Sequence, residues 1–138
     1  IRQVAASAQV ARELMLPEGE PVYEVLRLRR VGDEPLSLHV SYLPVSLCPQ
    51  LEEQDLEGQQ LCDILEQNYR FTIDRGVETL EITKASAEEA QLLAVRPGVP
   101  LLFLEQIVYD QQERRIEYAK ILLLSHKIKL RMEYSRPC

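Results

Sequence analysis

The chain has 138 residues, and hydrophobic residues make up 46% of them, a composition typical of one soluble globular domain. Its formal net charge is −6. Residues 1–69 carry 12 acidic and 5 basic side chains and residues 70–138 carry 10 and 11, so neither half has the basic surplus of a nucleic-acid-binding surface. No apolar stretch approaches the roughly 20 residues that a membrane-spanning helix requires.

The cysteines limit the kinds of metal site and the cellular compartment that the sequence is compatible with. Cys48, Cys62 and Cys138 are odd in number and form neither a Cys-x-x-Cys pair nor a Cys/His ligand spacing. This pattern predicts free thiols rather than a disulfide framework or a structural zinc site. Free thiols, together with a chain start that lacks a basic and apolar leader, favour the cytoplasm. We expect neither a metal nor a cofactor.

The first half of the chain predicts a strand, a helix and a two-stranded hairpin. Apolar residues at helical spacing follow Ser7, a residue type favoured at helix N-termini, and Pro17–Pro21 breaks the helix. Two alternating stretches joined by Gly32–Pro35 then match a hairpin. The predicted strands are Ile1–Ala6, Val22–Val31 and Leu36–Leu43.

The second half begins with an acidic connecting segment, residues 44–59, and continues with helices and strands. Ser86 and Glu89 match a capping box, and Arg96–Gly98 ends the helix that they begin. The predicted elements are a helix from Leu61 to near Tyr69, a strand Val77–Lys84, a helix Ala87–Leu93, and strands Leu101–Tyr109, Arg115–Leu124 and Ile128–Tyr134. Hairpin-joined strands dominate this order, so we expect an α+β fold, a mostly antiparallel sheet flanked by short helices.

Motifs of the common enzyme classes are absent from the sequence. There is no G-x-S-x-G nucleophile elbow, no phosphate-binding P-loop and no G-x-G-x-x-G dinucleotide fingerprint. His39 and His126 are far apart in sequence and have no metal-ligand spacing. These absences argue against a hydrolase or a metalloenzyme.

Two arginines in the predicted hairpin are the most informative local feature. Period two in a strand places Arg27 and Arg29 on one face, where two guanidinium groups could bind a phosphate, sulfate or carboxylate. The alternative is a solvated sheet face with surface salt bridges. His39 lies on the return strand and either lines the same face or is a satisfied structural histidine.

Other candidate residues have equally plain alternatives. Glu117 lies in an otherwise apolar predicted strand and could hold a hydroxyl or an amine, or be an edge-strand charge. The acidic region Glu52–Glu66 is interpreted as a solvated surface. Cys62, on the short predicted helix, is interpreted as a small core residue.

An ordered set of short motifs runs along nearly the whole chain, from about residue 4 to residue 134, and resembles the UTRA domain. This is the effector-binding domain of the HutC-type branch of the GntR transcription regulators. The motifs are Pro17–Tyr23, Arg27–Arg29, Gly32–Pro35, Ser41–Pro44, Leu51, Asp55–Gly58, Leu61, Glu78–Thr79, Ala87–Leu93, Pro97–Leu102 and Ile116–Tyr118.

The resemblance implies a chorismate-lyase-like fold, a homodimer and a pocket for a small anionic effector. It also implies that operator DNA is bound only through a winged helix-turn-helix domain, which precedes this domain in the complete regulator and is absent from this chain. Residues 1–138 are then expected to be a single UTRA-like effector-binding domain. Effector binding would change the operator affinity of the separate domain.

The resemblance also implies an effector site. By position, Arg27 and Arg29 match the anion-binding arginines of the family, and Glu117 matches an acid that meets polar groups of the ligand. His39 stands where the family often has an acid. Gln60 and Cys62 replace the serine and tyrosine of a phosphate-binding Ser-Leu-Tyr motif, and Leu122 and Leu123 replace a pair of tyrosines.

These replacements favour an organic acid over an amino-sugar phosphate, because hydroxyl donors are lost and leucines are gained. Two alternatives stay open at this point. One is a chorismate-lyase-like enzyme that acts on a diacid. The other is a dimerisation module whose pocket has degenerated.

Overall fold

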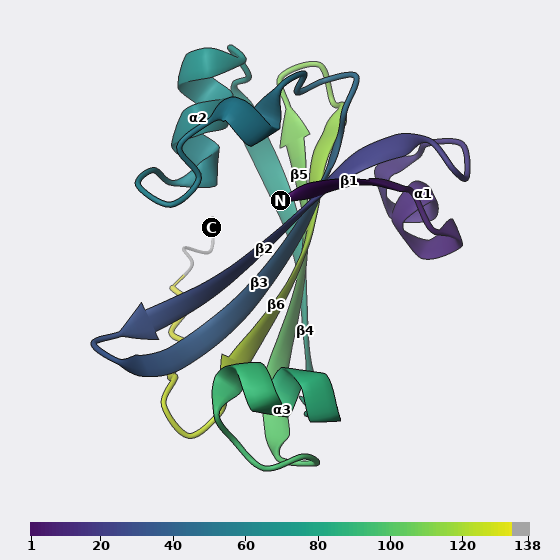
Figure 1. Ribbon diagram of the computed structural model, residues 1–138. Coiled ribbons are helices and arrows are strands. Elements are labelled where there is room, and N and C mark those ends of the chain that lie inside the picture. Colours follow the sequence, from purple (N-terminus) through teal and green to yellow (C-terminus); the bar gives the residue numbers. More distant parts are fainter. Residues whose placement is uncertain (134–138) are drawn as a thin grey trace, which may run out of the picture.

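The computed structural model describes residues 1–133, which build a six-stranded antiparallel sheet and three α-helices (Figure 1). The strands lie in the order β1-β2-β3-β6-β5-β4. This arrangement confirms the expected α+β fold. The elements are β1 Arg2–Ala5, α1 Ala8–Leu14, β2 Pro21–Val31, β3 Glu34–Pro44, the 3-10 helix η1 Leu51–Glu53, α2 Leu61–Asn68, β4 Ile73–Lys84, α3 Ala87–Leu93, β5 Pro100–Asp110 and β6 Arg115–Leu124.

Two helices begin at the serines that the sequence indicated. The Ser7 side chain accepts a hydrogen bond from the backbone N–H of Val10 at the start of α1. Ser86 and Glu89 form both hydrogen bonds of a capping box at the start of α3. These side chains satisfy backbone donors that a helix leaves unpaired in its first turn, so the sequence fixes both helix starts locally.

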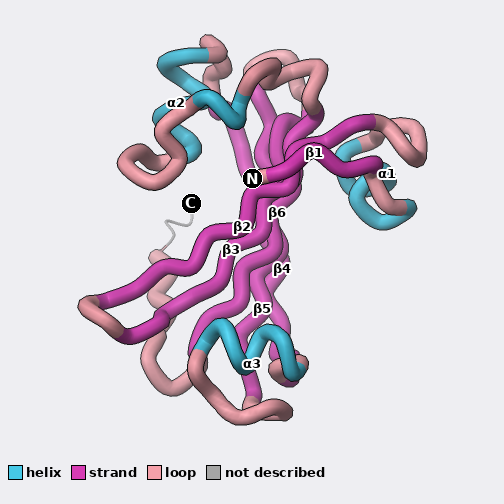
Figure 2. Tube along the Cα trace, in the orientation of Figure 1, coloured by secondary structure: helices cyan, strands magenta, loops and turns pink. Residues whose placement is uncertain are grey.

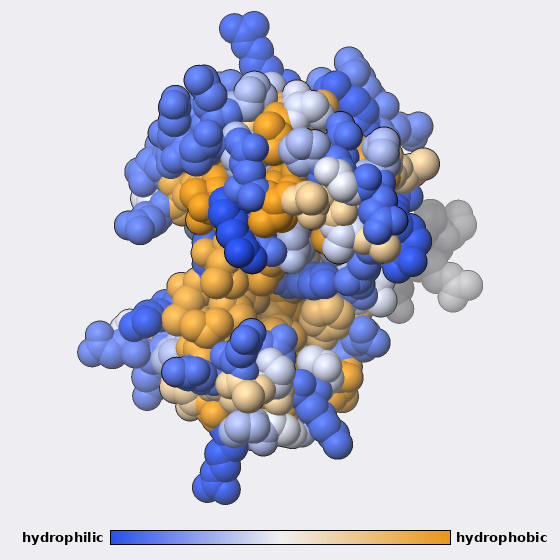
Figure 3. Space-filling model, turned by 45° about the vertical axis from the view of Figure 1, so that its right-hand side comes forward, coloured by the Kyte–Doolittle hydropathy of each residue, from blue (hydrophilic) through white to orange (hydrophobic). Residues whose placement is uncertain are grey.

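The sheet has two faces that differ in how they are covered. One face, called the arginine face below, carries Arg27 and Arg29 of β2 and, by register, Ser37, His39 and Ser41 of β3. Helix α2 lies over one end of it, and helices α1 and α3 lie over opposite ends of the other face (Figure 2). On the side seen in Figure 3, apolar side chains gather in a hollow between the two ends of the molecule.

Three apolar clusters hold the helices on the sheet. The largest lies on the arginine face, where Ile64 and Leu65 of α2 pack on Tyr23, Val25 and other buried residues. The second packs α3 on Leu38 and Leu122 at one end of the opposite face, and the third packs α1 on Val22 and Tyr118 at its other end. Burial of apolar surface on both faces is the main stabilising contribution to such a fold.

The predicted last strand, Ile128–Tyr134, is wrong over the residues that the structure describes. Residues 128–133 form no ladder, and Tyr134, like Cys138, lies outside the described residues. The alternation of apolar and basic residues is that of a strand, but a strand also needs a partner edge. The preceding strand, β6, is flanked on both sides by β3 and β5, so no edge beside it is open.

Strand β4 begins earlier than the alternation indicated, at Ile73 rather than Val77. Its first residues pair with the end of β5, where Ile73 lies opposite Asp110. The Arg75 guanidinium lies 3.8 Å from the centre of the Tyr109 ring, a cation–π contact that extends the pairing. Within residues 1–133, no helix is long and apolar enough to cross a membrane.

The β5–β6 turn is organised by one buried carboxylate. Asp110 is fully buried and accepts hydrogen bonds from the backbone N–H groups of Gln112 and Arg114 and from the Arg114 guanidinium, at 2.8–2.9 Å. Burial by itself raises the pKa of Asp110, but these hydrogen bonds and the charge of Arg114 outweigh it and lower the pKa. The ionised carboxylate therefore stabilises the turn.

We expect Asp110→Asn to lower the free energy of unfolding by about 2 kcal/mol, the scale of hydrogen bonds to a charged group. Urea denaturation followed by circular dichroism measures this, with an unchanged m-value. Asp33→Asn, in the exposed β2–β3 turn, is the matched control and should change stability little. Equal effects of the two substitutions would contradict the role assigned to Asp110.

Candidate functional site

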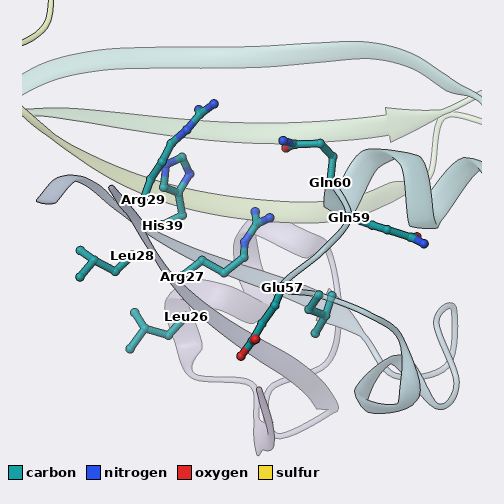
Figure 4. A pocket seen from close by; sticks show the side chains of 9 residues that line it. Leu26, Arg27, Leu28, Arg29, His39, Glu57, Gln59 and Gln60 are labelled. Carbon is teal, nitrogen blue, oxygen red and sulfur yellow. The ribbon is translucent and has the colours of Figure 1, made fainter. Parts of the chain in front are cut away.

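A cavity of about 510 Å³ lies between the β2–β3 hairpin and the segment that leads into α2 (Figure 4). One wall comes from β2 and β3, and the other comes from residues 56–60. The lining residues are Leu26, Arg27, Leu28, Arg29, His39, Leu56, Glu57, Gln59 and Gln60. This volume is within the range of small-molecule sites in proteins.

Strand alternation and register position the basic wall. Arg27 lies directly opposite His39, and Arg29 lies opposite Ser37, so all four side chains share the arginine face. The register shifts between Arg29 and Arg30, and Arg30 is not among the lining residues. In Figure 4, Leu26 and Leu28 point away from the two arginines, as the two-residue period requires.

Arg27 carries a polar atom without a partner. Its Nε is buried and has no hydrogen-bond acceptor among the described residues. A buried donor left unpaired costs about 1–3 kcal/mol. Arg27 as a residue belongs to the wall of the cavity, and its guanidinium group suits an anionic group there.

His39 is held as a neutral ring beside these charges. Its Nε2 and the Ser37 hydroxyl oxygen are 2.9 Å apart. Burial first, and then the positive charges of Arg27 and Arg29, lower the pKa of His39 to about 4. At neutral pH the histidine therefore adds no charge to the cavity and can both donate and accept a hydrogen bond.

Glu117 lies on the arginine face but does not line the cavity. Burial raises the pKa of Glu117, while a hydrogen bond with Ser41 and the charge of Arg27 partly oppose this rise. The carboxyl group is thus close enough to Arg27 to feel its charge. This placement makes Glu117 a neighbour of the wall that carries the arginines rather than part of the cavity lining.

The structure gathers four of the seven residues that the sequence singled out. Arg27, Arg29, His39 and Gln60 line the cavity. The interpretation of Cys62 as a small core residue is wrong, because Cys62 is exposed on α2 and its Sγ lies 3.9 Å from an oxygen of the neighbouring Asp63. Leu123 is buried in β6 opposite Ser37 and is not among the lining residues.

Sequence reasoning did not single out Leu56, Glu57 and Gln59 as site residues. They belong to the acidic segment that was interpreted as a solvated surface. The motif Asp55–Gly58 was the sequence signal that could have pointed to these residues. Its turn is stabilised by the Asp55 side chain, which accepts a hydrogen bond from the Gly58 backbone N–H at 2.9 Å. Buried Leu51 and Leu61 fix both ends of this segment in the core, and this brings it over the arginines.

The arrangement can bind but offers little for bond-making chemistry. The basic wall presents two guanidinium groups and a neutral imidazole, and the facing segment presents one carboxylate and two amides. Among residues 1–133, no group of three or more His, Cys, Asp or Glu side chains could hold a metal ion. The geometry suits a ligand with an anionic end and a hydrogen-bond donor at the other end.

The family model of the UTRA domain matches residues 1–129. An HTH-type transcriptional regulator of Rhizobium meliloti, RB1450, is 31% identical over 134 residues, covering 95% of this chain and 54% of the relative. The HTH-type transcriptional repressor NagR of Bacillus subtilis is 28% identical over 99 residues, covering 72% of this chain and 40% of the relative. The chain spans about half the length of the curated relatives it matches.

Two solved structures share the fold. The C-terminal domain of Yurk from Bacillus subtilis superposes with a TM-score of 0.91 at 22% identity, covering 96% of this chain and 92% of that one. The ligand-binding domain of a GntR-family transcriptional regulator from Bordetella bronchiseptica gives a TM-score of 0.88 at 29% identity, covering 97% and 86%. These relatives are regulators and not enzymes, which answers the enzyme alternative.

The depressed pKa of His39 makes the stability of the free protein depend on pH. The unfolded chain takes up a proton near the ordinary value of 6.5, and the folded protein does so only near pH 4. Folding is therefore favoured most above pH 6.5, and this contribution is lost as the pH falls from about 6.5 to about 4.

We expect His39→Gln to flatten this part of the stability profile, measured by urea denaturation at half-unit steps of pH. His126→Gln is the matched control, because His126 is exposed in the turn after β6. A profile of His39→Gln that still falls as steeply as that of the unmodified chain would show that His39 is not the group responsible.

Proposed function

The chain belongs to the UTRA domain family, and on this premise we propose that it is the effector-sensing domain of a bacterial transcription regulator. Residues 1–138 act as one domain, in a cytoplasmic homodimer of the HutC type. The effector is a small anionic metabolite, either an organic acid or a phosphorylated compound. Its binding modulates the DNA affinity of a separate winged-helix domain.

The observation that carries this proposal is the pair of arginines in the cavity wall. Arg27 and Arg29 project on the same side of β2, and the buried Nε of Arg27 lacks an acceptor among residues 1–133. Two guanidinium groups side by side match the bidentate geometry of a carboxylate or phosphate. An anion would supply both the missing acceptor and a counter-charge.

The facing segment supports an organic acid that also carries a hydroxyl or ammonium group. Glu57 can accept a hydrogen bond from such a donor. The side-chain amides of Gln59 and Gln60 can donate a hydrogen bond to the anionic end of the ligand or accept one from its other end. Among residues 1–133, no serine, threonine or tyrosine lines the cavity, so the described lining lacks the hydroxyl donors that a phosphate would use. A carboxylate needs fewer of them.

The sheet gives a route from the cavity to the N-terminus. β1 pairs with the first residues of β2, the strand that carries both arginines, and Arg2 forms a 2.8 Å ion pair with Glu24. Glu24 also accepts from the Tyr42 hydroxyl of β3. A shift of β2 on effector binding would therefore move β1, through which a preceding domain would be connected.

We expect Arg27→Ala and Arg29→Ala each to weaken effector binding by about 1.5–3 kcal/mol, the scale of a charge-assisted hydrogen bond. A thermal-shift screen of organic acids, sugar phosphates and amino acids identifies a binder, and isothermal titration calorimetry then gives the affinities.

Arg30→Ala is the matched control, because Arg30 is exposed and lies outside the cavity lining. Unchanged affinity in both Arg27→Ala and Arg29→Ala would refute this site. A screen without any binder would favour the degenerate-pocket alternative, in which the chain only holds two copies together.

Binding should also take up a proton. A bound anion offsets the charges of Arg27 and Arg29, which are among the causes that lower the pKa of His39, so the pKa of His39 should rise in the complex. Affinity for the tightest-binding carboxylate of the screen is then expected to increase as the pH falls from 7.5 to 5.5, and His39→Gln should abolish the increase. Calorimetry in buffers of different ionisation enthalpy counts the protons; no proton uptake would rule out this linkage.

A further inference from the structure

Residues 127–133 have the pattern of a strand but no strand partner in the described structure. Ile128, Leu130 and Met132 alternate with Lys127, Lys129 and Arg131. Leu130 is 45% exposed and Met132 is 82% exposed. A segment that alternates in this way and exposes its apolar side chains has the properties of a strand that pairs with another surface.

The sheet, in turn, has a long strand with an open edge. β4 pairs with β5 along its whole length, and no described strand lies on its other side. Nearly all its residues are exposed, and Leu80 and Ile82 are 44% and 75% exposed. Natural proteins usually cover or shorten such an edge, because its free N–H and C=O groups pair readily with another strand.

The start of the segment is held near β3, away from β4 of its own chain. Lys127 forms an ion pair of 2.9 Å with Glu34, at the first residue of β3. In the sheet order, β6 and β5 separate β3 from β4, so this ion pair leads the segment toward the opposite side of the sheet. An intrachain pairing with β4 would have to break the contact and cross β5.

The sheet has two open edges, and their charges decide which of them suits the segment better. β1 pairs only with Pro21–Glu24, so the outer edge of the rest of β2 is also open, but it carries Arg27, Arg29 and Arg30. The segment is itself basic and would be repelled there. β4 carries Glu78 and Glu81 in its middle, and its other charged residues, Asp74, Arg75 and Lys84, lie toward its two ends. Opposite charges on neighbouring strands stabilise the pairing, and like charges oppose it.

We propose that residues 127–133 of one copy of this chain add as a strand to the β4 edge of a second copy, and that the exchange is reciprocal. The proposal rests on the homodimer of the proposed function and specifies its interface. Reciprocal exchange gives a closed two-fold dimer. The β4 edge of each copy is then covered by the segment of the other, so this contact cannot add further copies. Leu80 and Ile82 of one copy then gain apolar neighbours from the segment of the other.

The test is a charge exchange in the full chain. Glu81→Lys and Lys129→Glu each place like charges together, and each acts twice in a reciprocal dimer. We expect each single variant to raise the dissociation constant of the dimer by about tenfold. The double variant restores opposite charges and should return the constant close to that of the unmodified chain. Sedimentation velocity over a concentration series gives these constants.

Matched controls change the same charges elsewhere on the surface. Glu66→Lys on α2 and Arg96→Glu after α3 alter exposed residues away from β4 and the segment, and should leave the dimer unchanged. Leu130→Pro removes a backbone donor from the segment and should weaken the dimer without a loss of fold, because Leu130 belongs to no ladder. Circular dichroism confirms the fold of every variant.

The outcomes separate this inference from the effector function. A chain that stays monomeric at all concentrations, or a dimer that tolerates Leu130→Pro and both charge reversals, would overturn the strand exchange. A dimer weakened by Val31→Lys but not by Glu81→Lys would place the interface at the β2 edge and would also overturn it. Effector binding, measured by thermal shift on the same variants, reports the arginine site independently of the dimer.

Discussion

The cavity depends on the two-residue period of β2, which places Arg27 and Arg29 on one face, and on the register with β3, which sets their neighbours. Arg27 and Arg29 are two residues apart, and their cross-strand neighbours are a histidine and a serine rather than acids. The positive field has no counter-charge within the lining except Glu57 on the facing segment. The neutral state of His39 and the unpaired donor of Arg27 both accompany this arrangement.

A site of this kind needs a rigid support, because a flexible wall would let the arginines relax into solvent. The apolar cluster under α2 fixes one end of the arginine face, and the clusters under α3 and α1 fix the two ends of the opposite face. The hairpin that carries the arginines is therefore held from both sides of the sheet. A wall that is already held in place lowers the conformational cost of binding.

Local signals predicted what is local in this fold. Period two placed Arg27 and Arg29 on one face and left the face of His39 open, and the serines at positions 7 and 86 marked helix starts. Glu57 and Gln59 could not be placed this way, because their segment reaches the cavity only through the packing of Leu51 and Leu61 in the core. The strand expected at Ile128–Tyr134 shows the same limit, since alternation measures the tendency to pair and says nothing of whether an edge is available.

The net charge of −6 can be related to the surroundings of the cavity. Glu57 lines the cavity opposite the arginines, and Glu52, Glu53 and Asp55 lie in the same segment of the chain. The long-range field of the domain repels polyanions such as nucleic acid, and salt screens it over about 10 Å. The arginines act at hydrogen-bond distance, where screening is weak. The acidic surface therefore disfavours a long polyanion more than a small one, and the two guanidinium groups remain available to a ligand that is small enough to enter the cavity.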